Sequence, residues 1–480
     1  MRRTKIVATM GPATDTQDRV DALVEAGVDV VRMNFSHDTP EKHKRRAEMV
    51  RNSAKKYGRT VAILGDLQGP KIRIERFKND KIFLNRGDRF VLDAELDSDA
   101  GDQERVGIAY KTLPSEVTQG DELWLDDGRI VLVVDKTVGS EVHTSVVNGG
   151  YLSNKKGINR RGGGLSADAL TEKDKLDIKT AADMDVDFLA VSFPRNAADM
   201  EYARELMQAA GSNAALVAKI ERAEAVEEET LKGIIRASEV IMIARGDLGV
   251  EIGDERLPQA QKSMIKLARD MDTVVITATQ MMETMVENPI PTRAEVFDVA
   301  NAVMDGTDAV MLSGETAAGA HPCMVVRTMA RICEKAEESS ITKSSHHRMD
   351  IEFTRRDEGI AMASMYIANH MAVKGIAALT ETGSTVLWMS RISSSIAIYA
   401  LTRSEKTCRR VALFRGVCPV LLNDFPGDPK EANRIAVEQL IENNIVDDGD
   451  LVLITKGDAM GDKGGTNQMK LIRVGDHHNG

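Results

Sequence analysis

Residues 239–247, EVIMIARGD, form a continuous apolar run that ends in charged residues, and the pattern returns as TVVITATQ at 273–280 and DAVMLSGE at 308–315. Apolar runs without polar alternation are typical of strands buried on both faces of a parallel sheet. Helical patterns separate the runs, and one of them begins with the capping box Thr292-Arg-Ala-Glu295. This part of the chain therefore predicts repeated strand–helix units.

The same pattern extends toward the N-terminus and gives eight expected strands in all. The other five runs lie at 5–11, 28–35, 61–69, 187–193 and 214–221. Amphipathic helices are expected at 40–56, 171–182, 197–210, 256–271 and 293–304. Eight strands that alternate with helices predict an α/β fold, a (β/α)8 TIM barrel. An open doubly wound sheet is the alternative, although no G-x-G-x-x-G follows the first strand.

Two segments lie outside the alternation and divide the chain. Residues 72–167 contain IFLNRGDRFVLD and DELWLDDGRIVLVVD, which alternate and carry Gly and Asp turns, so they predict an inserted antiparallel β lid domain, a small β-barrel. The polar stretch SSITKSSHHRMD after Glu338 predicts a linker, and from about residue 357 the chain returns to an α/β pattern. We therefore expect a barrel domain from 1–71 and 168–340, the inserted domain at 72–167, and a C-terminal α/β domain at 341–480.

Composition excludes several classes of protein. The 63 Lys and Arg against 74 Asp and Glu give a net charge of −11, which argues against a chain-wide nucleic-acid surface. The four cysteines form no CxxC pair and indicate no disulfide framework. The N-terminus, MRRTKIVATMG, lacks the apolar core of a signal peptide, and no run of 18 apolar residues occurs. We expect a cytoplasmic protein with neither nucleic-acid nor membrane partners.

Polar side chains gather where the predicted strands end, which is where barrel enzymes place their active sites. They are Arg32, Asn34, Ser36, Asp66, Lys71, Arg73, Ser192, Lys219, Glu221, Arg245, Asp247, Thr279, Gln280, Ser313 and Glu315. A solvated strand end or an ordinary ion pair is the alternative for each residue taken alone. Convergence of the whole set favours a catalytic centre.

The residue types point to phosphate chemistry. Glu221 and Asp247 follow neighbouring strands, and a pair of carboxylates suits Mg²⁺ or Mn²⁺. Lys219 alternates with Glu221, so both side chains point to the same side and the ammonium can stabilise a phosphoryl group in transfer. Arg32 and Arg73 can bind phosphate bidentately. Backbone N–H groups near Gly246 can bind an anion.

At this point the sequence resembles a known family. VAKIERAEAV at 217–226 is similar to the active-site signature of pyruvate kinases. Further matching segments are RMNFSH at 32–37, GDLQGPKIR at 65–73, ARGDLGVE at 244–251, TATQMMETM at 277–285, NPIPTRAEVFDVANAV at 288–303 and MLSGETAAG at 311–319. The segments occur in order and cover nearly the whole chain. The resemblance implies a bacterial pyruvate kinase, a homotetramer with a lid and a regulatory C-terminal domain.

The resemblance implies transfer of phosphate from phosphoenolpyruvate to ADP, giving pyruvate and ATP in glycolysis. It assigns the metal to Glu221 and Asp247, and the phosphoryl group to Lys219, Arg73 and Arg32. Gly246, Asp247, Thr279 and Lys219 would bind substrate, with Thr279 on the face where C3 is protonated. Asn34, His37 and Arg73 would lie on the nucleotide side. Another phosphoenolpyruvate-utilising barrel enzyme and a catalytically silent metabolite-binding relative remain open alternatives.

Two departures from the family pattern concern its monovalent cation site. Many members hold K⁺ with Asn, Ser, Asp and Thr, and Asn34, Ser36 and Asp66 match the first three. Leu67 stands at the threonine position, and Lys71 replaces a nearby glutamate. Because an ammonium group supplies the charge that a monovalent cation otherwise brings, we expect activity without K⁺.

A hydroxyl-rich turn in the C-terminal domain predicts an anion site, with a simple helix cap as the alternative. Its residues are Thr380, Thr382, Gly383, Ser384 and Thr385. By resemblance this is the phosphate loop for an allosteric sugar phosphate. Glu381 stands where bisphosphate-activated members often have lysine, and residues 457–465 carry neither Trp nor Arg. We expect a sugar monophosphate or nucleotide monophosphate effector rather than fructose 1,6-bisphosphate.

Overall fold

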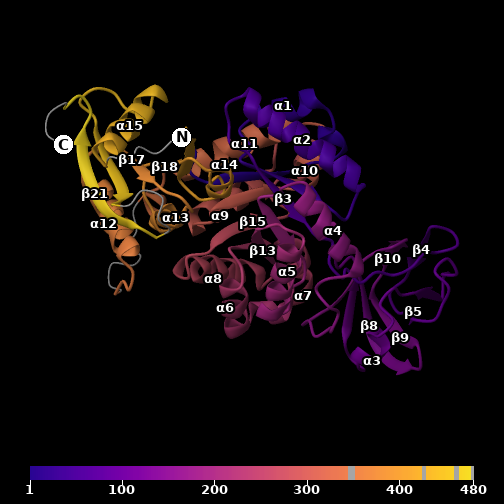
Figure 1. The fold of residues 1–480 in the computed structure, drawn as a ribbon. Helices are drawn as coiled ribbons and strands as arrows, with labels where there is room; N and C mark the ends of the chain where they lie inside the picture. Colours follow the sequence, from indigo (N-terminus) through magenta and orange to yellow (C-terminus); the bar gives the residue numbers. More distant parts are fainter. Residues whose placement is uncertain (344–351, 424–428, 459–463, 477–480) are drawn as a thin grey trace.

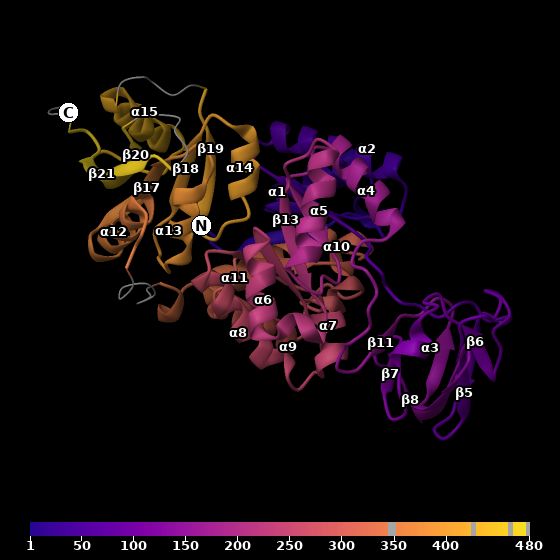
Figure 2. The same ribbon diagram turned by 60° about the horizontal axis from the view of Figure 1, so that its bottom comes forward.

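The computed structural model describes residues 1–343, 352–423, 429–458 and 464–476. A central barrel carries a sheet domain at one end and an α/β domain at the other (Figure 1). Helices surround the barrel strands, as the turned view shows around β13 (Figure 2). No helix among these residues is long and apolar enough to cross a membrane.

The eight predicted strands form a closed parallel barrel, which confirms the TIM-barrel prediction and makes the doubly wound alternative wrong. The strands are β1 Lys5–Thr9, β2 Val30–Asn34, β3 Ala62–Asp66, β12 Phe188–Val191, β13 Ala215–Ile220, β14 Val240–Ala244, β15 Val274–Ala278 and β16 Ala309–Leu312. Closure comes from β1, which pairs with both β2 and β16. Each strand lies within its predicted apolar run.

Burial on both faces explains why the runs do not alternate. Ile6 and Ile63 pack against the surrounding helices, whereas their neighbours Val7 and Leu64 fill the barrel interior with Met242. The covering helices are α1 Gln17–Glu25, α2 Pro40–Lys56, α4 Glu172–Asp183, α5 Ala197–Ala209, α6 Glu228–Arg236, α8 Leu257–Asp270, α9 Arg293–Asp305 and α11 Pro322–Ala336.

Two short helices begin directly after strands, where the sequence predicted only strand ends. They are α7 Arg245–Ile252 and α10 Gly314–Ala317, so Asp247 and Glu315 lie in helical turns. The apolar pattern runs on from β14 into α7, and for this reason it does not mark the boundary between them. Single 3-10 turns complete the unit: η1 Pro12–Thr14, η2 Ala223–Val226, η3 Glu283–Val286 and η4 Ser340–Thr342.

The inserted sheet domain follows β3 and holds its own apolar core. Its elements are β4 Lys81–Leu84, β5 Arg89–Asp93, β6 Arg105–Gly107, α3 Leu113–Glu116, β7 Glu122–Leu125, β8 Ile130–Val138, β9 Glu141–Asn148, β10 Gly150–Ser153 and β11 Ile158–Arg160. The main sheet has the order β11-β7-β8-β9-β5-β6. It is antiparallel as predicted, except that β5 and β6 pair in parallel.

The C-terminal domain is a five-stranded sheet of order β19-β18-β17-β20-β21 with helices packed on it. Its elements are α12 Arg356–His370, β17 Val373–Leu379, α13 Ser384–Arg391, β18 Ile398–Thr402, α14 Glu405–Val411, β19 Val417–Leu421, α15 Pro429–Glu442, β20 Leu451–Gly457 and β21 Thr466–Arg473. Only the β20–β21 pair is antiparallel. The expected linker contains the 3-10 turn η4 in its first part, and residues 344–351 lie outside the described residues.

A buried ion pair joins the C-terminal domain to the underside of the barrel. Asp308, just before β16, binds both arms of the Arg391 guanidinium, and both side chains are 1% exposed. The same carboxylate accepts hydrogen bonds from the backbone N–H groups of Val275 and Arg415. This carboxylate therefore ties two barrel strands to the α/β domain.

We predict that Asp308→Asn destabilises the protein by about 3–5 kcal/mol, because it leaves the buried Arg391 charge without a counterion. Urea denaturation measures the loss in the free energy of unfolding, with the unfolding of the barrel and of the C-terminal domain monitored separately. The control is Glu338→Gln, which breaks an exposed pair with Lys335 and should cost no more than about 1 kcal/mol. Equal midpoints for the Asp308 variant and wild type would contradict the prediction.

Candidate active site

A buried ammonium group lies at the centre of the predicted site. Lys219 projects from β13, and its Nζ lies 3.0 Å from Oε1 of Glu221 and 3.4 Å from Oδ1 of Asp66. The same nitrogen donates a 2.7 Å hydrogen bond to Oγ of Ser192. Burial lowers the pKa of Lys219, but Asp66 and Glu221 outweigh burial and raise it overall. The lysine is therefore held as a cation at the mouth of the barrel.

Asp66 connects this lysine to a second cation. The Arg32 Nε lies 2.6 Å from Oδ2 of Asp66, and its Nη1 donates to the Thr9 hydroxyl at 3.2 Å. Burial opposes ionisation of Asp66, yet Lys219 and Arg32 together lower its pKa. A fully buried carboxylate on β3 thus fixes two positive groups, one on β2 and one on β13.

Glu221 differs from Asp66, because its charge is not fully compensated. Its side chain is 1% exposed, and Oε2 accepts a 2.9 Å hydrogen bond from the backbone N–H of Phe193. Burial raises the pKa of Glu221 to about 7; Lys219 opposes this rise, while Asp247 adds to it. A carboxylate short of positive charge beside a second carboxylate is a setting that a divalent cation would stabilise.

Asp247 is the second carboxylate, in the first turn of α7. Its Oδ1 lies 3.0 Å from Nζ of Lys71, and its side chain remains 22% exposed. Among the described residues there is no group of three or more His, Cys, Asp or Glu suited to a metal. The two carboxylates that the sequence assigned to a cation are of the kind that suits Mg²⁺ or Mn²⁺, which is completed by substrate oxygens and water.

Thr279 lies beside α7 in a strained turn. Both Thr279 and Gln280 have positive φ, 65° and 55°, a region that non-glycine residues seldom occupy. The Arg245 guanidinium donates to the Thr279 carbonyl at 2.7 Å and pairs with Asp298 at 2.6 Å. The Thr279 hydroxyl accepts the Gly246 N–H at 2.8 Å. That N–H, expected to be open for a substrate, therefore already has a partner.

Other predicted residues make contacts away from this centre. Arg73 donates to the Lys155 carbonyl of the inserted sheet domain at 3.0 Å. Oδ1 of Asn34 accepts the Ser36 N–H at 3.1 Å, and the His37 carbonyl lies 2.8 Å from Nε2 of His43.

Two further members of the predicted set have supporting roles. Leu67 is 1% exposed and offers only its carbonyl, which accepts the hydroxyl of Ser192. Glu315 is buried, which raises its pKa, and it accepts the N–H groups of Ser313 and Met282. Glu315 therefore orders the turns after β15 and β16.

Sequence reasoning placed Ser192 among the strand-end residues without a specific role, and it missed Thr9. Ser192 links the Leu67 carbonyl to Lys219, and Thr9 supports Arg32. Both residues lie at strand ends, as the charged residues do, and that position was the available signal. A hydroxyl at a strand end is common, which left nothing to distinguish these two.

Comparison with known proteins identifies the family. The model for the pyruvate kinase barrel domain matches residues 1–326, and that for the pyruvate kinase alpha/beta domain matches residues 358–472. This chain belongs to the pyruvate kinase family. A pyruvate kinase of Haemophilus influenzae is 58% identical over 461 residues, covering 95% of this chain and 96% of that protein. Pyruvate kinase II of Salmonella typhimurium is 55% identical over 476 residues, 99% of both chains.

The hydroxyl-rich turn of the pyruvate kinase alpha/beta domain is held by its own side chains. The Thr380 hydroxyl accepts the N–H of Gly383, which adopts φ +84°, and the hydroxyls of Thr382 and Ser384 lie 3.2 Å apart. Thr385 bonds to Thr466 of β21 at 2.8 Å. The turn therefore precedes α13 in a fixed conformation.

One departure from the bisphosphate-activated pattern, Glu381, lies within this turn. The Glu381 carboxylate lies 3.2 Å from Nε of Arg403, so the negative charge at this position has a partner. Residues 459–463 of the predicted effector loop at 457–465 lie outside the described residues.

We predict that Ser192→Ala lowers kcat about tenfold with little change in the KM for substrate, because Lys219 loses one of its positioning partners. Steady-state kinetics measures both constants. Ser212→Ala is a matched control. Ser212 is also buried, but it lies in the turn before β13, at the opposite end of that strand from Lys219. An unchanged kcat in the Ser192 variant would show that the ion pairs alone position the lysine.

Proposed function

We propose that this chain transfers the phosphoryl group of phosphoenolpyruvate to ADP, yielding pyruvate and ATP, with Lys219, Glu221 and Asp247 at the reacting centre. The observation that carries the proposal is the buried Lys219 ammonium, held by Asp66, Glu221 and Ser192 at the barrel mouth. Family membership supports the reaction, and the contacts support the roles of these residues.

The chemistry needs charge stabilisation more than covalent catalysis. A terminal oxygen of ADP attacks phosphorus, and the bond between phosphorus and the enol oxygen breaks. Lys219 and Arg32 stabilise the negative charge on the phosphoryl group in transfer, and Asp66 positions both. The enolate left behind takes a proton at C3 from the side of Thr279, through water.

Glu221 and Asp247 would hold a divalent cation, Mg²⁺ or Mn²⁺. When bound, such a cation neutralises charge on the enolate and phosphoryl oxygens. The raised pKa of Glu221 supports this assignment, because a nearby cation favours the ionised carboxylate. The first turn of α7 at Gly246 and Asp247, which the Thr279 hydroxyl holds through the Gly246 N–H, would orient the substrate carboxylate.

Asn34, His37 and Arg73 are assigned to the nucleotide side. The inserted sheet domain, with proposed limits at 72–167, would act as a lid that excludes water during transfer. Arg73 supports this assignment because it lies at the base of that domain and contacts its Lys155 carbonyl.

We predict that Lys219→Met lowers kcat about 100- to 1,000-fold, because it removes an electrostatic stabiliser of the transition state. The assay couples pyruvate formation to lactate dehydrogenase with phosphoenolpyruvate, ADP and Mg²⁺ present. Lys262→Met, at an exposed lysine of α8, is the control and should retain wild-type activity. Wild-type enzyme that forms no pyruvate would favour a silent relative, and pyruvate formed without ADP would favour another phosphoenolpyruvate-utilising enzyme.

We further propose that Lys71 replaces K⁺. Two contacts support this: Lys71 Nζ lies 3.0 Å from Oδ1 of Asp247, and the buried Leu67 supplies no hydroxyl for a monovalent cation. The charge that K⁺ would bring is thus covalently attached next to the carboxylate pair.

We predict full activity in buffer free of K⁺ and Na⁺, using tetramethylammonium as counterion. Lys71→Met should lower kcat about tenfold to 100-fold because it removes the built-in charge, and added K⁺ should restore part of the loss. Lys71→Arg, which keeps the charge, is the matched control. A wild-type rate near zero that K⁺ restores would contradict the proposal.

The remaining assignments concern regulation and assembly. We assign the turn of Thr380, Thr382, Gly383, Ser384 and Thr385 to the phosphate of a sugar monophosphate or nucleotide monophosphate. Glu381 supports a monophosphate, because a carboxylate at this position supplies no cation for a second phosphate. We also assign the protein to a homotetramer in the cytoplasm.

A further inference from the structure

The return connection from the inserted sheet domain to the barrel contains an unusual run of glycines. Gly162, Gly163 and Gly164 follow β11 directly, and all three adopt positive φ, at +86°, +74° and +86°. Glycine occupies this region at little cost, and such a run imposes little stiffness on the chain. The orientation of the inserted sheet domain must therefore be fixed by contacts beside the glycines.

Two buried barrel side chains make these contacts. Glu251, at the end of α7, interacts with the side chain of Asn159 on β11, and its Oε2 accepts the Ala223 N–H at 2.7 Å. The Glu251 carbonyl also accepts the Gly162 N–H at 2.9 Å. Arg222 Nη2 donates to the Leu165 carbonyl, just after the glycines. We call Glu251, Arg222 and Asn159 the hinge cluster.

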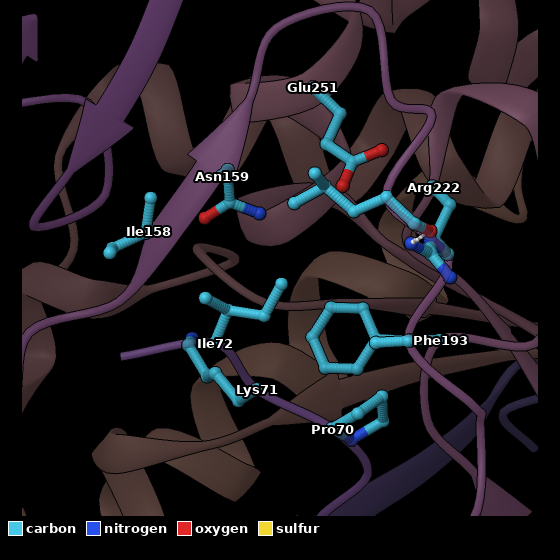
Figure 3. A pocket seen from close by; sticks show the side chains of 10 residues that line it. Pro70, Lys71, Ile72, Ile158, Asn159, Phe193, Arg222 and Glu251 are labelled. Atoms are coloured by element: carbon cyan, nitrogen blue, oxygen red, sulfur yellow. Dashed lines mark hydrogen bonds between the residues drawn. The ribbon is translucent and has the colours of Figure 1, made fainter. Parts of the chain in front are cut away.

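The hinge cluster lines a small cavity between the inserted sheet domain and the barrel. Figure 3 shows Asn159 from β11 and Glu251 from α7 directed into the same space, with Phe193 and Ile72 at its other side. The cavity therefore has walls from both domains.

Each barrel wall of this cavity adjoins a group assigned to the reaction. Lys71 pairs with Asp247, and the N–H of Phe193 binds Glu221. Arg222 directly follows Glu221, and Glu251 lies one helical turn after Asp247. A displacement at the hinge cluster would therefore reach both proposed metal carboxylates.

The buried charged groups of the hinge cluster are unfavourable for the stability of the fold, so stability alone does not explain them. Arg222 is 4% exposed, and its Nη1 has no hydrogen-bond partner in the part of the chain that the structure describes. Its Nε lies 3.2 Å from Glu224 rather than contacting Glu251. Burial raises the pKa of Glu251 to about 7. Such buried polar groups are costly in a fold, and they persist where geometry matters more than stability.

We propose that Glu251 and Arg222 are positioning residues that hold the inserted sheet domain in register with the carboxylates Glu221 and Asp247. The inference rests on the proposed function for its catalytic consequence. Its structural half, that these two side chains fix the glycine segment, stands independently.

The test compares Glu251→Ala with Glu251→Gln. The alanine variant loses the side-chain contacts with Ala223 and Asn159. Glutamine keeps an oxygen that can accept the Ala223 N–H, and it remains a polar partner for Asn159. We expect Glu251→Ala to lower kcat about tenfold or more with a smaller change in the KM for phosphoenolpyruvate. Pyruvate formed per ATP should rise above one as water enters the site. Glu251→Gln should restore both quantities toward wild type.

The matched control is Glu255→Ala. Glu255 contacts the same return segment through Arg161 at 3.5 Å, but its side chain is 68% exposed. An exposed pair of this kind contributes little, so both kcat and the product ratio should stay at wild-type values. Thermal melting of each variant excludes loss of folded protein as the cause.

A second measurement does not require activity. Hydrogen exchange of the amides at 158–166 should be faster in Glu251→Ala and in Arg222→Ala than in wild type or Glu255→Ala. In a double-mutant cycle on the free energy of unfolding, the combined effect of Glu251→Ala and Asn159→Ala should be smaller than the sum of the two single effects, because both substitutions remove the same contact.

The two halves of the inference fail separately. Unchanged exchange together with an unchanged product ratio in Glu251→Ala would overturn the positioning role. Equal loss in the alanine and glutamine variants would overturn it as well. A wild-type enzyme that forms no pyruvate would contradict the proposed function, while the exchange result would still decide the role of the hinge cluster.

Discussion

The site depends on one buried charge arrangement. A single ammonium, Lys219, is shared between Asp66 and Glu221 at the ends of β3 and β13, the two strands that flank β12. Burying three such charges is unfavourable unless each has a partner, and the barrel provides the partners at fixed spacing. Asp66 is balanced by Lys219 and Arg32, which lower its pKa, whereas burial outweighs Lys219 at Glu221 and raises its pKa to about 7. This difference supports the proposed cation site at Glu221.

The rest of the fold keeps this arrangement rigid. Closure of the barrel through β1 and β16 fixes the strand ends relative to one another. At the opposite end of the barrel, Asp308 anchors Arg391 of the C-terminal domain, so β15 and β16, which lead to Thr279 and Glu315, also contact that domain. These two strands therefore offer a physical connection between the two domains, through packed and charged contacts.

Much of this architecture follows from sequence because its physical causes are local. The strands of the barrel are buried on both faces, so their runs stand out, and the Thr292–Glu295 capping box begins α9 in the structure. The boundary of α7 was missed because apolar residues continue from β14 into the helix.

Glu221 and Asp247 were predictable as neighbours because β13 and β14 are adjacent. The sequence did not predict the contacts of three further residues, because those contacts form only when distant segments meet; they are Ser192, Thr9 and Asn159. The run Gly162–Gly164 was the available signal for the hinge.

If Glu221 and Asp247 hold the divalent cation as proposed, Lys219 competes with that cation for Glu221, because its ammonium lies 3.0 Å from Oε1. Titration of Mn²⁺ into the enzyme without substrates, read by electron paramagnetic resonance, tests it most directly. Lys219→Met should bind Mn²⁺ at least as tightly as wild type, because the ammonium 3.0 Å from Oε1 is gone. Glu221→Gln should weaken Mn²⁺ binding about tenfold or more. Loss of Mn²⁺ binding in Lys219→Met, with Glu221→Gln unaffected, would contradict the account.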